Sequence, residues 1–462
     1  MVRLGEAVGL FLKEESVPVM DFAREDYEQR VDRLVRCMEE KGLTHMVIYG
    51  DREHFSNVEY FTHYDCRFEE TLLVVSQEGR LSMVVGNEGM GYSRVIPVDV
   101  DRYLYQNFSL QGQPRDKLEL LERILGRIGL NEGTYAGIVG VKYFHEGEID
   151  SDPDQTYDLP QYILDAIKRT GTRMINATKE ITGVPDGIRM RLYTAKEIAW
   201  AETAGNRAAS VVQRLLKHMK EGIREYELAE LAGVGFDPQN TWPLVNFGEE
   251  SVNVGMGSPR NIPLVAGEPG GVCYSVRGNL TSRVAILAYG EESCKEELKP
   301  YLDSFYKKYF EALAAWYETL RVGATGGELH DAVMSLIGGE EYGVTLNVGH
   351  NTGTEEWSNA ISYKNSEIPV VDGAFMQADI IAHGENPVRT AICEDAVVVA
   401  GKDLRRELEA EYPEVYERIR IRRQAMRDVL GIRLHEDVLP MSNLNGAYFP
   451  FLLDTGKVLV KK

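Results

Sequence analysis

The first part of the chain alternates between helical and strand-like spacings of apolar residues. Residues 24–42 place four apolar side chains on one helical face before a glycine stop, and these are Val31, Leu34, Val35 and Met38. Residues 45–50 form a continuous apolar run that predicts a buried strand, and two apolar runs around the turn "QEGR" predict a hairpin. Amphipathic helices are predicted over 115–129 and 159–169, with a strand-like run between them. This alternation predicts an α/β domain.

The second part of the chain has fewer but longer helical patterns. Between residues 176 and 193, glycine, proline and mixed charge break the periodicity, so we expect a boundary near residue 187 and domains at 1–187 and 188–462. Thr194 and Glu197 form a capping-box pattern at the start of a long helix. The other predicted elements are a strand-rich stretch at 246–288, helices at 296–320 and 413–430, and strands at 343–349, 373–382 and 391–399. Long helices paired with strands predict an α+β domain.

Composition and charge argue against some classes of binding partner and indicate where the protein works. The 462 residues carry 72 acids and 51 bases, a formal net charge of −21, which would repel nucleic acid and anionic lipid surfaces. The first twenty residues carry acids in their only apolar run, so we expect no signal peptide, and no stretch reaches transmembrane length. The five cysteines are widely spaced without a CxxC pair, which predicts reduced thiols in a cytoplasmic protein.

Three polar residues interrupt or end apolar runs in the second part. His350 follows "GVTLNVG", Asp379 lies inside "GAFMQADIIA", and Glu394 lies inside "AICEDAVVV". A carboxylate among apolar residues is costly unless it is paired, hydrogen-bonded or metal-bound. One such residue alone indicates a satisfied structural network, but three on successive strands could converge on one site. One histidine with two carboxylates is also a ligand set suited to a hard divalent metal.

These segments resemble a known family in their order along the chain. "VGHNTG", "DGAFMQADIIA" and "AICEDAVVVAG" are similar to the histidine turn and the two glutamate strands of the creatinase, prolidase and aminopeptidase P family, the pita-bread hydrolases. Residues 193–229 resemble that family's first catalytic-domain helix, and residues 51–75 resemble its N-terminal domain. The resemblance implies a creatinase-like α/β N-terminal domain, a pita-bread α+β C-terminal domain and a homodimer.

The resemblance implies two divalent metals bound by two aspartates, a histidine and two glutamates, and this chain departs from that set. His350, Asp379 and Glu394 match the last three positions, but no aspartate occurs between Asp237 and Asp303, where the first two belong. Two carboxylates cannot offset two closely spaced dications, so a dinuclear site is not expected. We expect no metal, or one weakly bound Mn, Zn, Co or Fe ion on the three residues, and the chain has no nucleotide fingerprint.

Other parts of the family's proton-transfer machinery are also missing. No histidine occurs between His218 and His330, where the resemblance places creatinase's base, and Trp357 or a neighbour stands where metallopeptidases have a second histidine. Since N-terminal-domain residues reach the neighbouring active site in creatinase-like dimers, His54 and Arg67 are candidates for substrate binding. A surface or structural role for these two is the alternative.

The expected function is hydrolysis of a C–N bond in a small peptide or amidino compound, as in Xaa-Pro peptidases and creatinase. His350, Asp379 and Glu394 would be the catalytic residues of a degenerate metal site. The alternative is a catalytically inactive family member that binds a peptide, a small ligand or a protein partner in the former active-site cleft.

Overall fold

The computed structural model describes residues 1–233 and 238–462, and these form two compact units. One unit comprises Asp21–Arg189, and the other comprises Met1–Met20 together with Met190–Lys462. The division along the chain therefore lies beside the expected boundary, while the first twenty residues belong to the larger unit. Among the described residues, no helix is both long and apolar enough to cross a membrane.

The smaller unit is a three-layer α/β structure around a six-stranded sheet of order β5-β4-β3-β2-β6-β7. Its strands are β2 (His45–Gly50), β3 (Thr71–Ser76), β4 (Leu81–Val85), β5 (Asp101–Leu104), β6 (Tyr135–Val139) and β7 (Arg173–Asn176). Its helices are α2 (Arg24–Lys41), α3 (Ser56–Thr62), α4 (Asn87–Tyr92), α5 (Leu121–Ile128), α6 (Gln161–Arg169) and α7 (Thr178–Thr182). Side chains of β2 alternate between two cores, with Met46 and Ile48 facing α2 and Val47 and Tyr49 facing α5 and α6.

Helix α2 illustrates how the sequence pattern produces this packing. Val31, Leu34 and Met38 are buried on its inner face, and Gly42 ends the helix in the left-handed conformation with φ of 66°. The predicted helix is therefore confirmed. Helix α5 is shorter than predicted, because only Leu121–Ile128 is helical within the expected 115–129.

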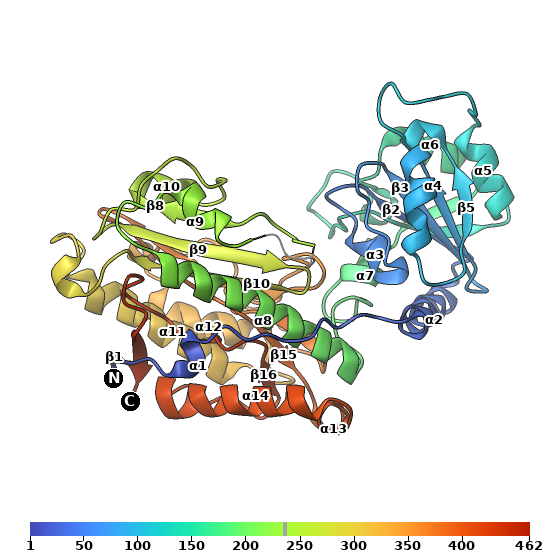
Figure 1. The fold of residues 1–462 in the computed structure, drawn as a ribbon. Helices are drawn as coiled ribbons and strands as arrows, with labels where there is room; N and C mark the ends of the chain where they lie inside the picture. Colours follow the sequence, from blue (N-terminus) through green and yellow to red (C-terminus); the bar gives the residue numbers. More distant parts are fainter. Residues whose placement is uncertain (234–237) are drawn as a thin grey trace. The chain divides into compact units, whose positions relative to one another are not determined.

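The larger unit has a five-stranded sheet of order β13-β14-β10-β9-β8, a four-stranded sheet of order β11-β12-β15-β16, and a terminal ribbon of β1 and β17. Its strands are β1 (Val2–Glu6), β8 (Leu244–Phe247), β9 (Pro269–Val276), β10 (Asn279–Ile286), β11 (His350–Asn351), β12 (Ala374–Gln377), β13 (Ala382–Glu385), β14 (Val388–Glu394), β15 (Ala396–Val399), β16 (Val438–Pro440) and β17 (Lys457–Lys461). Its helices are α1 (Gly9–Leu12), α8 (Ala195–His218), α9 (Glu225–Glu230), α10 (Gly248–Val254), α11 (Lys307–Thr319), α12 (Gly326–Ile337), α13 (Lys402–Glu411) and α14 (Pro413–Ala425). In Figure 1, α8 runs along the β9–β10 hairpin, and the two ends of the chain meet in the β1–β17 ribbon.

Helix α8 is fixed at its start and in its middle. The Thr194 hydroxyl accepts a hydrogen bond from the Glu197 amide, as its capping sequence predicts. Glu202, fully buried in the helix, pairs with Arg418 and Arg422 of α14 at 2.7 and 2.6 Å. Two cations compensate one buried carboxylate, so this network holds α14 against α8.

Three predicted strands differ from the structure around the candidate residues. The predicted strand 343–349 is wrong, since extended pairing begins only at His350 in the two-residue strand β11. The predicted strand 373–382 divides into β12 and β13, and Asp379 lies in the link between them. The predicted strand 391–399 breaks at Asp395, so β14 lies in the five-stranded sheet and β15 in the four-stranded one. The sequence did not indicate these strand ends, because the residues on both sides of each break are buried and apolar residues continue across it.

Candidate metal and active site

His350 is held in one orientation by its surroundings. Strand β11 pairs antiparallel with β12, which places His350 opposite Gln377, and the histidine side chain is completely buried. Its Nδ1 lies 3.1 Å from the carbonyl oxygen of Asn351, so we assign the Nδ1 proton to this hydrogen bond. The assignment leaves Nε2 as the nitrogen that faces the acidic side chains.

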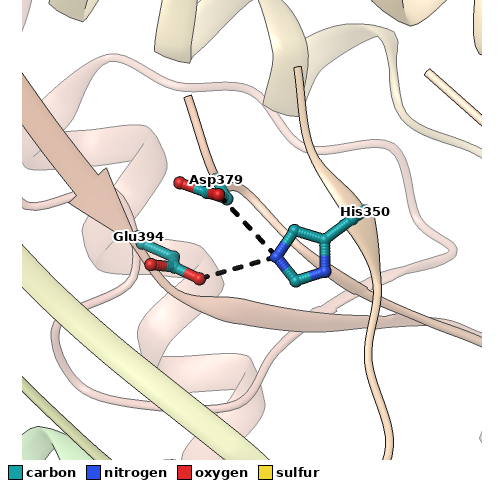
Figure 2. Close-up of side chains that lie close together, drawn as sticks. All are labelled: His350, Asp379 and Glu394. Atoms are coloured by element: carbon teal, nitrogen blue, oxygen red, sulfur yellow. Dashed lines mark ion pairs between the residues drawn. The ribbon is translucent and has the colours of Figure 1, made fainter. Parts of the chain in front are cut away.

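Asp379 and Glu394 converge on that nitrogen from the two sheets. Asp379 Oδ2 lies 3.8 Å from His350 Nε2, and Glu394 Oε1 lies 3.7 Å from it (Figure 2). The donor atoms of the three residues all lie within 4.8 Å of one another, and the three side chains are buried. The convergence expected from the sequence pattern is therefore present in the fold.

A third carboxylate, which the sequence analysis did not identify, approaches the same histidine. Glu356 Oε1 lies 2.9 Å from His350 Nε2, and the Glu356 side chain is 27% exposed. Beside it, the Trp357 ring stacks on the His350 ring with centroids 4.1 Å apart and an interplanar angle of 18°. Glu356 lies six residues after His350 in the polar turn "NTGTEEW", where the sequence does not distinguish it from an exposed glutamate.

Burial and mutual repulsion shift the protonation of the cluster. Burial raises the pKa of Asp379 to about 6, against the opposing effect of the His350 imidazole. Burial, and then the charge of Asp379, hold the pKa of Glu394 well above its usual range. Burial by itself lowers the pKa of His350, but the carboxylates of Glu356 and Glu394 outweigh it and hold that pKa well above the ordinary value. A metal-free cluster therefore retains protons at neutral pH.

The neighbouring sheet face carries neutral side chains. In the register of β9, β10 and β14, Cys273 lies opposite Ser282, and Ser282 lies opposite Glu394, so the three side chains point to one face. Neither β9 nor β10 contains an aspartate or glutamate. Burial, and then the charges of Glu394, Glu356 and Asp379, hold the pKa of the Cys273 thiol well above its usual range. This face supplies a neutral thiol and a hydroxyl.

An internal ion pair fixes the end of β14 that carries Glu394. Arg283 and Asp395 are both fully buried and lie 2.8 Å apart. Arg283 Nη1 also donates to the backbone carbonyls of Ser282 at 2.6 Å and Glu394 at 3.1 Å. Because both charges are paired and hydrogen-bonded, they can stay buried, and the Glu394 backbone is held against β10.

His54 and Arg67 lie in the smaller unit with partners of their own. His54 Nδ1 lies 3.1 Å from Asp51, and the Arg67 guanidinium lies 3.3 Å from Asp65 and donates to the Tyr92 hydroxyl at 3.1 Å. Both side chains are about half exposed, at 49% and 54%. Their substrate-binding role stays a prediction.

Residues 199–399 match the model of metallopeptidase family M24. These residues belong to that family. The expected relationship to creatinase, prolidase and aminopeptidase P is confirmed.

Solved structures of three peptidases share the fold at low sequence identity. A prolidase from Thermococcus sibiricus superimposes with a TM-score of 0.63 and 16% identity, covering 82% of this chain and 95% of the other. An Xaa-Pro dipeptidase from Bacillus anthracis gives 0.59 and 14%, covering 82% and 96%, and the His243Ala form of Escherichia coli aminopeptidase P gives 0.59 and 13%, covering 82% and 93%. No curated protein matches the sequence. The expected fold, a creatinase-like α/β domain with a pita-bread α+β domain, is confirmed.

The M24 family implies divalent metal, and the donor set fits one ion. Asp379 Oδ1 and Glu394 Oε1 are buried and have no hydrogen-bond partner among the described residues. The separations of 3.7 and 3.8 Å from His350 Nε2 suit two donors of one ion, which lie about 3.0 to 4.2 Å apart when each bond is about 2.1 Å. The Nδ1 hydrogen bond to a backbone carbonyl is the support that metal-binding histidines commonly have. The neutral face of β9 and β10 does not fit a second ion, which would need bridging carboxylates.

Proposed function

We propose that this chain hydrolyses a C–N bond in a small peptide or amidino compound at a mononuclear site of His350, Asp379 and Glu394. One observation carries the proposal: two buried carboxylates, each with one oxygen that has no hydrogen-bond partner among the described residues, converge on Nε2 of one oriented histidine. Such an arrangement is stable only with a proton or a metal cation between the groups. The proposed ion is Mn, Zn, Co or Fe, and no nucleotide cofactor is proposed.

The side chains of the site have separate tasks in this proposal. A divalent ion held by the three residues would polarise a carbonyl group and lower the pKa of a water molecule. Complete burial and the stacked Trp357 ring exclude bulk water from one face of His350.

The charge of the cluster favours a cationic substrate group. Glu356, Asp379 and Glu394 are acids, and the facing residues Cys273 and Ser282 are neutral. An α-amino group or a guanidinium can donate hydrogen bonds to carboxylate oxygens of the cluster that do not bind the ion. The likeness to a prolidase, an Xaa-Pro dipeptidase and an aminopeptidase P supports a short peptide as the substrate.

The second candidate is a catalytically inactive family member that binds a peptide, a small ligand or a protein partner in the same cleft. Its support is the neutral pair Cys273 and Ser282 on the sheet face beside Glu394. With a thiol and a hydroxyl there, the cluster could recognise a ligand without cleaving it.

We also propose that the protein is a cytoplasmic homodimer, as the family relationship suggests. Sedimentation velocity of the purified chain should give a mass of about twice 52.0 kDa. A single 52.0 kDa species across concentrations would contradict the dimer.

Turnover of a panel of Xaa-Pro peptides and amidino compounds tests the enzyme proposal. We expect hydrolysis by the wild type and a loss of at least about a hundredfold in His350→Ala, because the only nitrogen donor of the site is removed. His218→Ala, at the exposed C-terminal end of α8, is the matched control and should keep full activity. If no compound is cleaved while one of them raises the Tm, the binding candidate replaces the enzyme.

A further inference from the structure

Glu356 contacts His350 but is not one of the three residues of the proposed site, so its contact has no role in that site. Of the three carboxylates near His350 Nε2, it is the closest, at 2.9 Å compared with 3.7 and 3.8 Å. It reaches the histidine from the turn after β11, whereas Glu394 comes from β14 and Asp379 from the link after β12. The turn after β11 therefore supplies an acidic donor that the ligand set inferred from the sequence did not include.

We propose that Glu356 is a fourth ligand of the metal ion and replaces part of the charge lost from β9 and β10. The inference rests on the proposed mononuclear site and extends it. With Glu356, three carboxylates and one neutral imidazole surround a single dication, a set of hard donors suited to Mn, Fe, Co or Zn. The ligands then come from β11 and the turn after it, from the link after β12 and from the end of β14, and none comes from the β9–β10 hairpin.

The distances support this assignment. A separation of 2.9 Å between Glu356 Oε1 and His350 Nε2 is close to the spacing of about 3.0 Å between adjacent donors of one ion with bonds of about 2.1 Å. The donors lying within 4.8 Å of one another are those of His350, Asp379 and Glu394. Glu356, whose side chain is 27% exposed, would complete the set by turning inward from its contact with His350.

The charges around His350 agree with this assignment. With Nδ1 donating to the Asn351 carbonyl, Nε2 faces the acidic side chains of Glu356, Asp379 and Glu394. A divalent ion bound between these groups would compensate their negative charge.

Titration of Mn²⁺ or Zn²⁺ into metal-free full-length protein, followed by calorimetry, tests the assignment. We expect one ion per chain in the wild type and at least about tenfold weaker binding in Glu356→Gln, which keeps the shape but removes the charge. Glu356→Asp, which keeps the charge but shortens the reach, should bind with intermediate affinity. Glu385→Gln, on the exposed edge of β13, is the matched control and should bind like the wild type.

Trp357 offers a second readout that does not depend on activity. Its ring adjoins Glu356 in sequence and stacks on His350, so inward movement of Glu356 should change its fluorescence as the ion binds. Trp357→Phe should remove that change. Glu356→Gln should lose the change at ion concentrations that saturate the wild type, and its circular dichroism spectrum should remain that of the wild type.

Three results would overturn the inference. Equal affinity in Glu356→Gln would mean that Glu356 is no ligand, and tighter binding would mean that it competes with the ion for His350. Failure of the wild type to bind either ion would also overturn it. The proposed hydrolase can fail separately. If Glu356→Gln loses the ion while the wild type hydrolyses no compound, Glu356 is still a metal ligand but the protein is not the proposed hydrolase.

Discussion

The orientation of His350 is set before any ligand binds. Its Nδ1 hydrogen bond, its burial and the stacked Trp357 ring together leave Nε2 facing the acids. A side chain held in this way loses little entropy when it binds an ion or a substrate, which is the benefit of preorganisation.

The sequence analysis identified three of the four residues in the cluster of His350, Asp379, Glu394 and Glu356. His350, Asp379 and Glu394 were detectable because a polar group in an apolar run must have a partner. Glu356 lies in a polar turn, where an acid is ordinary, so nothing in its sequence context distinguishes it from exposed glutamates. Only the path of the chain after β11 brings it to 2.9 Å from the histidine.

The stability of the metal-free protein should respond to the protonation of Asp379. Its pKa is about 6 in the folded chain and about 3.9 in an unfolded chain, so the folded state binds this proton more tightly. The stabilisation is complete below about pH 4 and is lost as the pH rises through about 6. Asp379→Asn has no carboxyl to titrate at this position and should not lose this stabilisation. The unfolding free energy of the variant minus that of the wild type should therefore increase by about 1–3 kcal/mol as the pH rises from about 4 to above 6.

Urea unfolding at several pH values in the presence of a chelator measures this difference. Asp403→Asn, whose side chain is 98% exposed, is the surface control and should change the unfolding free energy by less than about 0.5 kcal/mol. A constant difference between Asp379→Asn and the wild type would contradict the assigned protonation of the cluster.

At the scale of elements, the sequence predicted helices better than strand ends. Helices α2 and α8 carry periodic apolar faces and clear stop or capping residues, which act locally. The predicted strand 343–349 has left-handed glycines at both ends, Gly343 and Gly349, and in the described part of the chain it pairs with no strand. Since pairing partners are distant in sequence, the apolar run could not reveal that pairing begins at His350.

The glycine before His350 should be essential to the site. Gly349 has φ of 90°, and a Cβ there would lie 2.9 Å from both the Trp316 Nε1 and the Gln377 carbonyl oxygen. We expect Gly349→Ala to lower the unfolding free energy by about 2–4 kcal/mol through backbone strain and overpacking. It should also weaken metal binding about tenfold or more, because β11 must move and carry His350 with it.

Gly323→Ala separates the two causes. Gly323 has a similar φ of 82° but no atom within 4 Å of the added Cβ, so only the strain of about 1 kcal/mol applies. Its metal affinity should equal that of the wild type. If Gly349→Ala also retained wild-type affinity, the position of His350 would not depend on that close approach.

At the scale of the whole molecule, the fold persists at low sequence identity, whereas a reduced ligand set is our proposal. TM-scores near 0.6 at 13–17% identity show that the architecture persists, while the β9–β10 hairpin carries no acidic residue at all. A scaffold can keep its shape when individual ligands change, because packing depends on apolar burial and sheet register. For this reason the match of residues 199–399 to metallopeptidase family M24 does not by itself fix the number of ions.

The fold class of both units followed from the sequence pattern and the family resemblance, but the path of the terminal residues did not. Residues 1–20 belong with the larger unit, where β1 pairs with β17 and the Gln213 side chain donates to the Phe11 carbonyl at 2.9 Å. These contacts join positions about 200 or more residues apart, and no local sequence pattern predicts them.

The most direct test of the mononuclear site is elemental analysis of the purified full-length protein after incubation with Mn, Zn, Co or Fe and desalting. We predict about one ion per chain in the wild type and none in Glu394→Gln, because three carboxylates and one histidine compensate a single dication. About two ions per chain would contradict the site as derived from its charges, and no ion in any of the four preparations would contradict metal binding itself.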